Sequence, residues 1–131
     1  MILIEECWKA LTSANMSSYI RYLYKTVRKY FGEAVVVTQE VDDIISSPIV
    51  KESIINNADC KILLDQRKYR NKFDQIQTLL GLTDKERAQV LSINLSNDPA
   101  RRYKEVFISL GGVQSAVYAT EVSDEEYLVR P

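Results

Sequence analysis

The chain has 131 residues, of which 46% are hydrophobic and 27% charged, and its net charge at pH 7 is −1. This length and composition are typical of a folded domain, so we expect one domain over residues 1–131 and no long disordered segment. The small net charge excludes a global basic field, so any contact with nucleic acid or a membrane has to be local. Because there is no histidine and the cysteines lie far apart in sequence, a Ser-His-Asp triad and a zinc site are excluded.

Both cysteines, Cys7 and Cys60, adjoin apolar runs. This pattern predicts buried thiols in a reducing compartment rather than a disulfide, so we expect a cytoplasmic location. No run approaches the ~20 consecutive apolar residues that cross a bilayer, and no basic and then apolar leader precedes Ile2. We therefore expect a chain that is neither secreted nor membrane-spanning.

The first expected element is a strand over residues 2–4, where three branched apolar residues predict burial on both faces. Glu5 and Glu6 follow at the point where this strand would leave its sheet. Two carboxylates there suit an NTPase, because one acid can hold the water shell of Mg²⁺ while its neighbour orients the attacking water. The alternative is a pair of solvated acids at a strand terminus. A strand this near residue 1 also indicates a piece of a longer protein.

The next expected element is a long amphipathic helix. Its apolar positions recur at intervals of three or four residues: Met16, Ile20, Leu23, Val27 and Phe31. Gly32 stands where a left-handed C-cap belongs, and Arg28 and Lys29 suit the negative end of the helix macrodipole. We therefore expect this helix to bury the apolar stripe and to end at Gly32.

A second strand is expected over residues 34–38, again covered on both faces, and it ends in the Thr-Gln pair 38–39. Strand, helix and strand together make a βαβ unit. After a turn over residues 41–46, Ser47 can cap a helix whose first position is Pro48. Residues 61–64 predict a third strand, and we expect all three to pair in parallel through right-handed crossovers.

The rest of the chain predicts a helical hairpin and then a β-hairpin. Apolar residues at helical spacing from Phe73 to Leu80 predict a helix that ends at Gly81, and Thr83 has capping-box spacing for a second helix. Residues 105–110 alternate as a strand, Gly111-Gly112 reverses the chain, and residues 114–122 pair back. Ser123 then caps a short terminal helix. The predicted fold class is α/β, with at least three parallel strands flanked by helices, an inserted helical hairpin and a C-terminal β-hairpin.

Three segments taken in order resemble a known family. They are residues 2–8, residues 28–32 and residues 35–39. Their sequence of a Walker B strand, a helix ending in Arg-Lys and a strand ending in Thr-Gln resembles the TraG-type conjugative-transposon ATPases, RecA-like motors of type IV secretion. Residues 61–65, 79–83 and 107–112 are also similar to that family. The resemblance implies an incomplete RecA-like P-loop NTPase core, the C-terminal part of a motor domain from Walker B onward.

The resemblance implies a role for four residues. Glu5 matches the Walker B acid that holds Mg²⁺, although this position is commonly an aspartate, and Glu6 matches the catalytic glutamate that polarises the attacking water. Gln39 matches the glutamine that senses the γ-phosphate, and its alternative is a strand-terminal turn residue. Arg28 lies where related hexameric motors place an arginine finger, and its alternative is an ordinary basic residue in a last helical turn.

A phosphate-binding loop is missing from the sequence. Such a loop reads G-x-x-x-x-G-K-[ST], and none of the glycines at 32, 81, 111 and 112 begins one. We therefore expect that the chain alone does not hydrolyse ATP, and that ATP and Mg²⁺ bind in a longer parent protein. For that parent the resemblance implies a hexamer, secretion-apparatus partners and a place at the inner face of the bacterial inner membrane.

A rival interpretation is a non-catalytic α/β module that binds a protein or nucleic acid through its basic helix. Arg21, Lys25 and Arg28 are spaced to form one basic stripe that could meet DNA, although such a stripe is more often a solvated face. Tyrosines 19, 22, 24 and 30 are interleaved with it. A third interpretation, a small hydrolase using Glu5 and Glu6, is weaker because adjacent strand residues point to opposite faces.

Overall fold

The computed structural model describes residues 1–5, 13–39, 55–95, 100, 103–111 and 113–129. Over these residues the fold is mixed α/β, as expected, and it divides into two compact units. The first unit comprises residues 1–58 with 78–80, and the second comprises residues 59–77 with 81–131. Several sequence predictions lie outside the described residues: Glu6, Cys7, the turn over 41–46, the helix from Pro48 and the glycine at 112.

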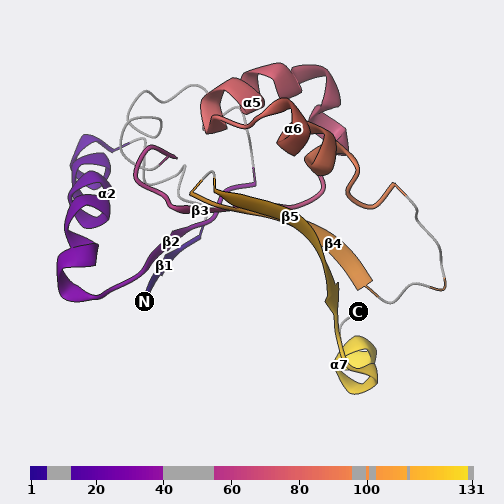
Figure 1. Ribbon diagram of the computed structural model, residues 1–131. Helices are drawn as coiled ribbons and strands as arrows, with labels where there is room; N and C mark the ends of the chain where they lie inside the picture. Colours follow the sequence, from indigo (N-terminus) through magenta and orange to yellow (C-terminus); the bar gives the residue numbers. More distant parts are fainter. Residues whose placement is uncertain (6–12, 40–54, 96–99, 101–102, 112, 130–131) are drawn as a thin grey trace. The chain divides into compact units, whose positions relative to one another are not determined.

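The first unit contains a parallel pair of strands, β1 (Ile2–Ile4) and β2 (Ala34–Val36). Their register runs from Ile2 opposite Ala34 to Ile4 opposite Val36. Backbone hydrogen bonds continue the pairing at both ends: Ile2 N–H donates to the Glu33 carbonyl (2.7 Å) and Val37 N–H to the Ile4 carbonyl (2.9 Å). The predicted βαβ unit is therefore confirmed (Figure 1).

Helix α2 (Ala14–Thr26) packs on one face of this strand pair. Ile20 and Tyr24 of the helix form a buried cluster with Ile55. Partly buried apolar residues surround that cluster: Ile4, Ala34, Val36, Ala58, Leu79 and Leu80. On the opposite face Leu3, Val35 and Val37 are 39–52% exposed. The prediction that both strands are covered on both faces is therefore wrong, because alternate strand residues face opposite sides and α2 packs on only one of them.

The predicted apolar stripe is buried at Ile20 and Leu23, but Met16 in the first turn of α2 is 42% exposed and Phe31 is 100% exposed. The exposure of Phe31 follows from a change of helix type, because α2 ends at Thr26 and a 3₁₀ turn, η1 (Val27–Tyr30), follows it. A 3₁₀ helix has about 3.0 residues per turn instead of 3.6, so residues after Thr26 rotate away from the stripe.

The left-handed residue at this helix end is Phe31 (φ 53°, ψ 29°), not Gly32, so the predicted glycine cap is displaced by one position. A left-handed backbone costs a residue with a Cβ roughly 1–2 kcal/mol. Gly32 is needed for a different reason, since a Cβ there would lie 2.8 Å from the Val27 Cγ2 atom. The turn thus uses its glycine for a close approach and places the strained conformation on an exposed aromatic residue.

The second unit contains an antiparallel sheet in the order β3 (Cys60–Leu63), β4 (Tyr103–Leu110), β5 (Gln114–Glu121). The β4–β5 hairpin is confirmed, with Gly111 in the left-handed region at its reversal. The predicted third parallel strand is wrong, because β3 pairs antiparallel with β4. A short apolar run specifies burial but not the direction of its partner. Cys60 is exposed at the start of β3, so the prediction of a buried thiol is also wrong there.

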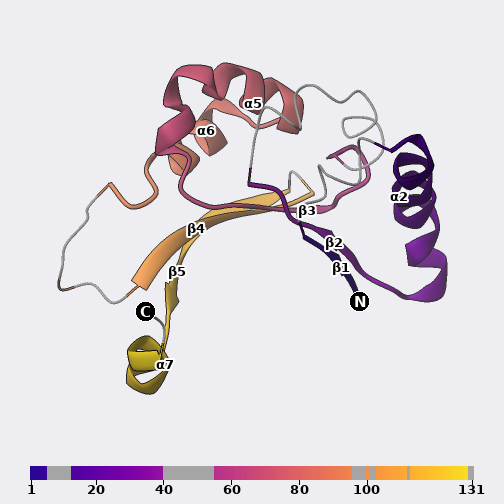
Figure 2. The ribbon, with the colours of Figure 1, turned by 180° about the vertical axis from the view of Figure 1, so that it is seen from behind.

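The predicted helical hairpin is formed by η3 (Arg67–Lys72), α5 (Phe73–Leu80) and α6 (Asp84–Leu91). Figures 1 and 2 show α6 over β4 and β5, and it contacts both strands. Five large side chains of this unit are fully buried or nearly so: Phe73, Ile76, Val90, Ile93 and Phe107.

The predicted helix ends of the second unit are confirmed. Gly81 ends α5 with φ +67°, and the Thr83 capping box forms as expected. Its two hydrogen bonds run from Glu86 N–H to Thr83 Oγ1 and from Thr83 N–H to Glu86 Oε1, both 3.2 Å. Helix α7 (Asp124–Val129) follows β5, and Glu126 N–H donates to the Ser123 hydroxyl.

Candidate functional site

The carboxyl ends of β1 and β2 define the candidate site. In a parallel pair both strands finish at the same edge of the sheet, which is where open α/β sheets bind ligands. Glu5 directly follows β1, and Thr38 and Gln39 follow β2 after Val37. The hydrogen bond from Val37 N–H to the Ile4 carbonyl holds these two chain ends next to each other. Glu5 and Gln39 are both exposed there, so the structure brings two of the four expected site residues to one edge.

A cation at this edge would have Glu5 as a described ligand. Mg²⁺ is usually held by one or two carboxylates, with water and substrate phosphate oxygens completing its octahedron. An exposed glutamate at a strand end fits that role. Among the residues that the structure describes, no group of three or more Asp, Glu, Cys or His side chains is placed to hold a metal ion. Glu6, the expected catalytic acid, lies outside the described residues.

Arg28 lies at the opposite edge of the same strands. In a βαβ unit the helix runs back antiparallel to the strands, so the end of α2 and η1 returns to the amino ends of β1 and β2. The Ile2–Glu33 hydrogen bond marks this edge, and the Arg28 guanidinium donates to the Asn57 carbonyl (3.3 Å). The structure therefore does not bring Arg28 together with Glu5 and Gln39.

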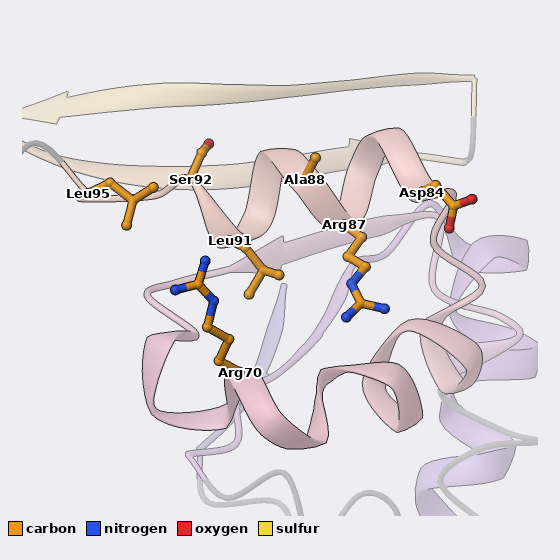
Figure 3. A pocket seen from close by; sticks show the side chains of 7 residues that line it. All are labelled: Arg70, Asp84, Arg87, Ala88, Leu91, Ser92 and Leu95. Atoms are coloured by element: carbon orange, nitrogen blue, oxygen red, sulfur yellow. The ribbon is translucent and has the colours of Figure 1, made fainter.

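A shallow hollow of about 350 Å³ lies in the second unit. It is lined by seven residues of η3, α6 and the turn after α6: Arg70, Asp84, Arg87, Ala88, Leu91, Ser92 and Leu95. Figure 3 shows the Arg70, Arg87 and Leu91 side chains extending into the same space between the helical segments. The sequence reasoning assigned no role to these residues.

The Arg87 side chain in this hollow belongs to a network that joins α5 to α6. Its guanidinium forms an ion pair with Asp74 and donates to Gln77 Oε1 (3.2 Å). The Gln77 amide donates in turn to Asp84 Oδ1 (3.0 Å) and to the Leu82 carbonyl (3.2 Å). Asp74 and Arg87 are 13 positions apart on consecutive helices, so no local sequence pattern indicated this network. We assign it a structural role.

The turn after β3 holds a second ion pair. Arg67 donates from Nε to both carboxylate oxygens of Asp65 (2.9 Å each), and its backbone N–H donates to Asp65 Oδ1 (3.0 Å). The hydrogen bond from the Arg67 side chain lowers the pKa of Asp65 below its usual value, against a smaller opposing effect of burial. This pair fixes the entry into η3.

Comparison with known proteins gives one family and one fold. A family model described as the TraG P-loop domain matches residues 1–130. The structure of VirB4 of Thermoanaerobacter pseudethanolicus aligns with a TM-score of 0.66 at 22% sequence identity, over 95% of this chain and 32% of that chain. At this identity the likeness shows the fold, and the chain spans about a third of the length of that structure. No curated protein sequence matches the chain.

None of the helices that the structure describes has both the length and the apolar character that a bilayer span needs.

Proposed function

Because the chain belongs to the TraG P-loop domain family, we propose that it is the C-terminal part of an ATP-hydrolysing motor that energises conjugative DNA transfer through a type IV secretion apparatus. In this proposal the chain covers the motor domain from its Walker B strand onward. The observation that carries the proposal is the parallel pairing of β1 and β2, since it puts Glu5 and Gln39 at one edge. The VirB4-like fold supports it as well.

The proposed chemistry is in-line attack of water on the γ-phosphate of ATP. Glu5 would hold Mg²⁺ through its carboxylate, and the ion would supply positive charge next to the phosphates. Glu6 accepts a hydrogen bond from the attacking water and orients it. The Gln39 amide can donate to a γ-phosphate oxygen and accept from the same water, so it senses whether the phosphate is present. Of these three residues, the two that the structure describes, Glu5 and Gln39, lie at the carboxyl ends of the two parallel strands.

Arg28 is proposed as an arginine finger that acts in trans. Its position at the amino ends of the strands keeps it from its own site, so it would complete the site of a neighbouring subunit in a homo-oligomer, which we propose is a hexamer. A guanidinium suits this role because it bonds two phosphate oxygens at once and stays charged. The other proposed partners are proteins of the secretion apparatus at the inner face of the bacterial inner membrane.

Mixing subunits tests the trans role of Arg28 in the parent protein, meaning a longer protein in which this chain follows a phosphate-binding loop. Parent subunits with Arg28→Ala should lose turnover as a pure oligomer. When these subunits are mixed with subunits that carry Gln39→Ala, part of the turnover should return. A site with an intact Gln39 can then receive an intact Arg28 from the neighbouring subunit. If mixing restores nothing while the subunits still assemble, Arg28 does not act in trans.

The phosphate site has to come from outside this sequence, since no glycine here begins a phosphate-binding loop. We therefore propose that the 131-residue chain is inactive alone and that the parent protein hydrolyses ATP with Mg²⁺. Steady-state phosphate release by both proteins, at equal concentration and with excess Mg²⁺, is the test. Robust turnover by the chain alone would contradict this proposal.

The rival function, a non-catalytic module that binds through its basic helix, has one observation in its favour. Arg21 and Lys25 are exposed on α2, as a binding surface requires. That surface does not compete with the motor proposal, because it is separate from the strand ends that carry Glu5 and Gln39.

A further inference from the structure

The outer side of α2 and η1 has an unusual charge. Over residues 13–32 the chain has four basic residues and no acidic one, whereas its net charge as a whole is −1. All four basic residues are exposed: Arg21, Lys25, Arg28 and Lys29. Among the described residues, none of Arg21, Lys25 and Lys29 has an ion-pair partner. A local positive field of this kind attracts an anionic partner despite the acidic average of the chain.

Exposed aromatic rings accompany these charges. Tyr19, Tyr22, Tyr30 and Phe31 are 51%, 63%, 79% and 100% exposed, respectively. Helix α2 buries Ile20, Leu23 and Tyr24 on its other side, so its packing does not require aromatic residues at the exposed positions. The Arg28 guanidinium donates to the Asn57 carbonyl, so we leave it out and call the other seven residues the basic-aromatic face: Arg21, Lys25, Lys29, Tyr19, Tyr22, Tyr30 and Phe31.

The backbone conformation and the exposed ring of Phe31 are not explained by the stability of the fold. Phe31 is left-handed (φ 53°), a conformation that glycine adopts without strain and phenylalanine does not. Its N–H donates to the Arg28 carbonyl, which fixes the backbone, while its ring is fully exposed. A strained backbone conformation at a residue whose side chain is not buried is typical of residues that are retained for binding.

We propose that the basic-aromatic face binds single-stranded nucleic acid. Phosphates would lie along Arg21, Lys25 and Lys29, and bases would stack on Tyr22, Tyr30 and Phe31. Single strands are favoured over duplexes because only unpaired bases offer their faces to aromatic rings. Stacking together with a basic track is how proteins bind such strands without reading their sequence. This inference does not depend on the proposed ATPase activity.

Binding to the 131-residue chain can be measured by fluorescence anisotropy with a labelled oligodeoxythymidine of about 20 nucleotides. We expect saturable binding that weakens as salt rises, with a log–log slope of roughly −2 for three phosphate contacts. An oligouridine of equal length separates RNA from DNA, and binding of either one supports the proposal. Duplex DNA of equal length should bind at least about fivefold more weakly.

Two sets of variants separate charge from stacking. Arg21→Glu with Lys25→Glu should weaken binding at least about tenfold and flatten the salt slope. The matched control is Lys85→Glu with Lys104→Glu, which reverses two exposed charges in the second unit and should change affinity less than about twofold.

The ring of Phe31 can be removed without harming the fold. Phe31→Gly suits the left-handed backbone, so it should keep or raise the melting temperature while weakening binding at least about fivefold with an unchanged salt slope. Phe31→Tyr keeps a ring and should bind normally. Loss of the ring with no change in affinity would show that no base stacks there, and would overturn the proposal.

Two further results would also overturn it. One is equal weakening by the control charge pair, which would mean that any positive charge on the chain suffices. The other is binding to phosphatidylglycerol vesicles but not to either oligonucleotide, which would assign the face to a membrane surface. Neither result bears on ATP turnover by the parent protein, so the two proposals fail separately.

Discussion

The two units of the molecule use their polar and aromatic side chains in different ways. In the second unit Thr83 and Glu86 cap each other, Asp74 pairs with Arg87, and Phe107 is fully buried. In the first unit Glu5, Gln39 and Phe31 face solvent. The difference indicates that these groups of the second unit form a scaffold by contacting one another or by burial, while these side chains of the first unit are presented to solvent. Substitutions should therefore affect stability in the second unit and binding or turnover in the first.

The largest expected contrast in stability is between two phenylalanines. Phe107→Ala removes a ring that is 0% exposed, so the free energy of unfolding should fall by about 3–5 kcal/mol through lost burial and a cavity. Phe31→Ala removes a ring that is 100% exposed and should change it by no more than about 0.5 kcal/mol. Urea unfolding of both variants measures this. Similar losses would contradict the division into a scaffold and a presenting unit.

The next effect concerns the residue that fastens the end of α6 to β4. Asn94 is left-handed (φ 57°), its side-chain oxygen accepts from Glu105 N–H (3.0 Å), and its own N–H donates to Glu105 Oε2. Asn94→Ala should cost about 2 kcal/mol, because it loses the acceptor and strains the backbone.

The matched variant Asn94→Gly loses the side-chain hydrogen bonds without straining the backbone, so it should cost only about 1 kcal/mol. Thermal unfolding of both ranks them. If the alanine variant is as stable as the glycine variant, the left-handed backbone at this position carries no strain.

A smaller effect is expected at the start of α6. Thr83→Ala removes the hydroxyl that accepts from Glu86 N–H but keeps the backbone N–H that donates to Glu86, and it should lower the free energy of unfolding by about 1 kcal/mol. Thr83→Ser keeps the hydroxyl oxygen and should be close to the unchanged protein. Guanidinium unfolding of the two variants measures the difference, and an alanine variant as stable as the serine variant would show that the cap contributes nothing.

The smallest effect should depend on pH. Arg67 lowers the pKa of folded Asp65 below 3.8, so the ionised carboxylate contributes stability above that pH, and the contribution is lost as the pH falls through the folded pKa. The pair is partly exposed, so Asp65→Asn should cost less than about 1 kcal/mol near neutral pH. Urea unfolding between neutral and acidic pH should show this cost shrinking toward zero. A cost that grows on acidification would contradict the sign.

Local signals in the sequence predicted much of this fold. The capping box at Thr83, the left-handed Gly81 and the hairpin reversal at Gly111 each depend on neighbouring residues only, so they could be read directly. The direction of β3 could not be predicted, because a run of apolar residues does not encode the strand with which it pairs. The exposure of Phe31 could not either, since a helical period assumes one helix type and η1 interrupts it.

The candidate site was predictable in part. The common edge of Glu5 and Gln39 follows from parallel pairing once the two strands are recognised. The position of Arg28 at the other edge also follows from the antiparallel direction of the helix, although the basic stripe alone did not indicate it. The network of Asp74, Gln77 and Arg87 was not expected, because it depends on how two consecutive helices pack.

Turnover of ATP by the parent protein with Glu6→Gln tests the central claim most directly, with Glu33→Gln as its control. Glu33 is an exposed acid at the amino end of β2, so its substitution makes the same chemical change at the edge opposite to Glu5 and Gln39. Glu6→Gln should reduce turnover about 100-fold or more while ATP still binds, and Glu33→Gln should leave it unchanged. Normal turnover with Glu6→Gln, or an equal loss from both substitutions, would contradict the account.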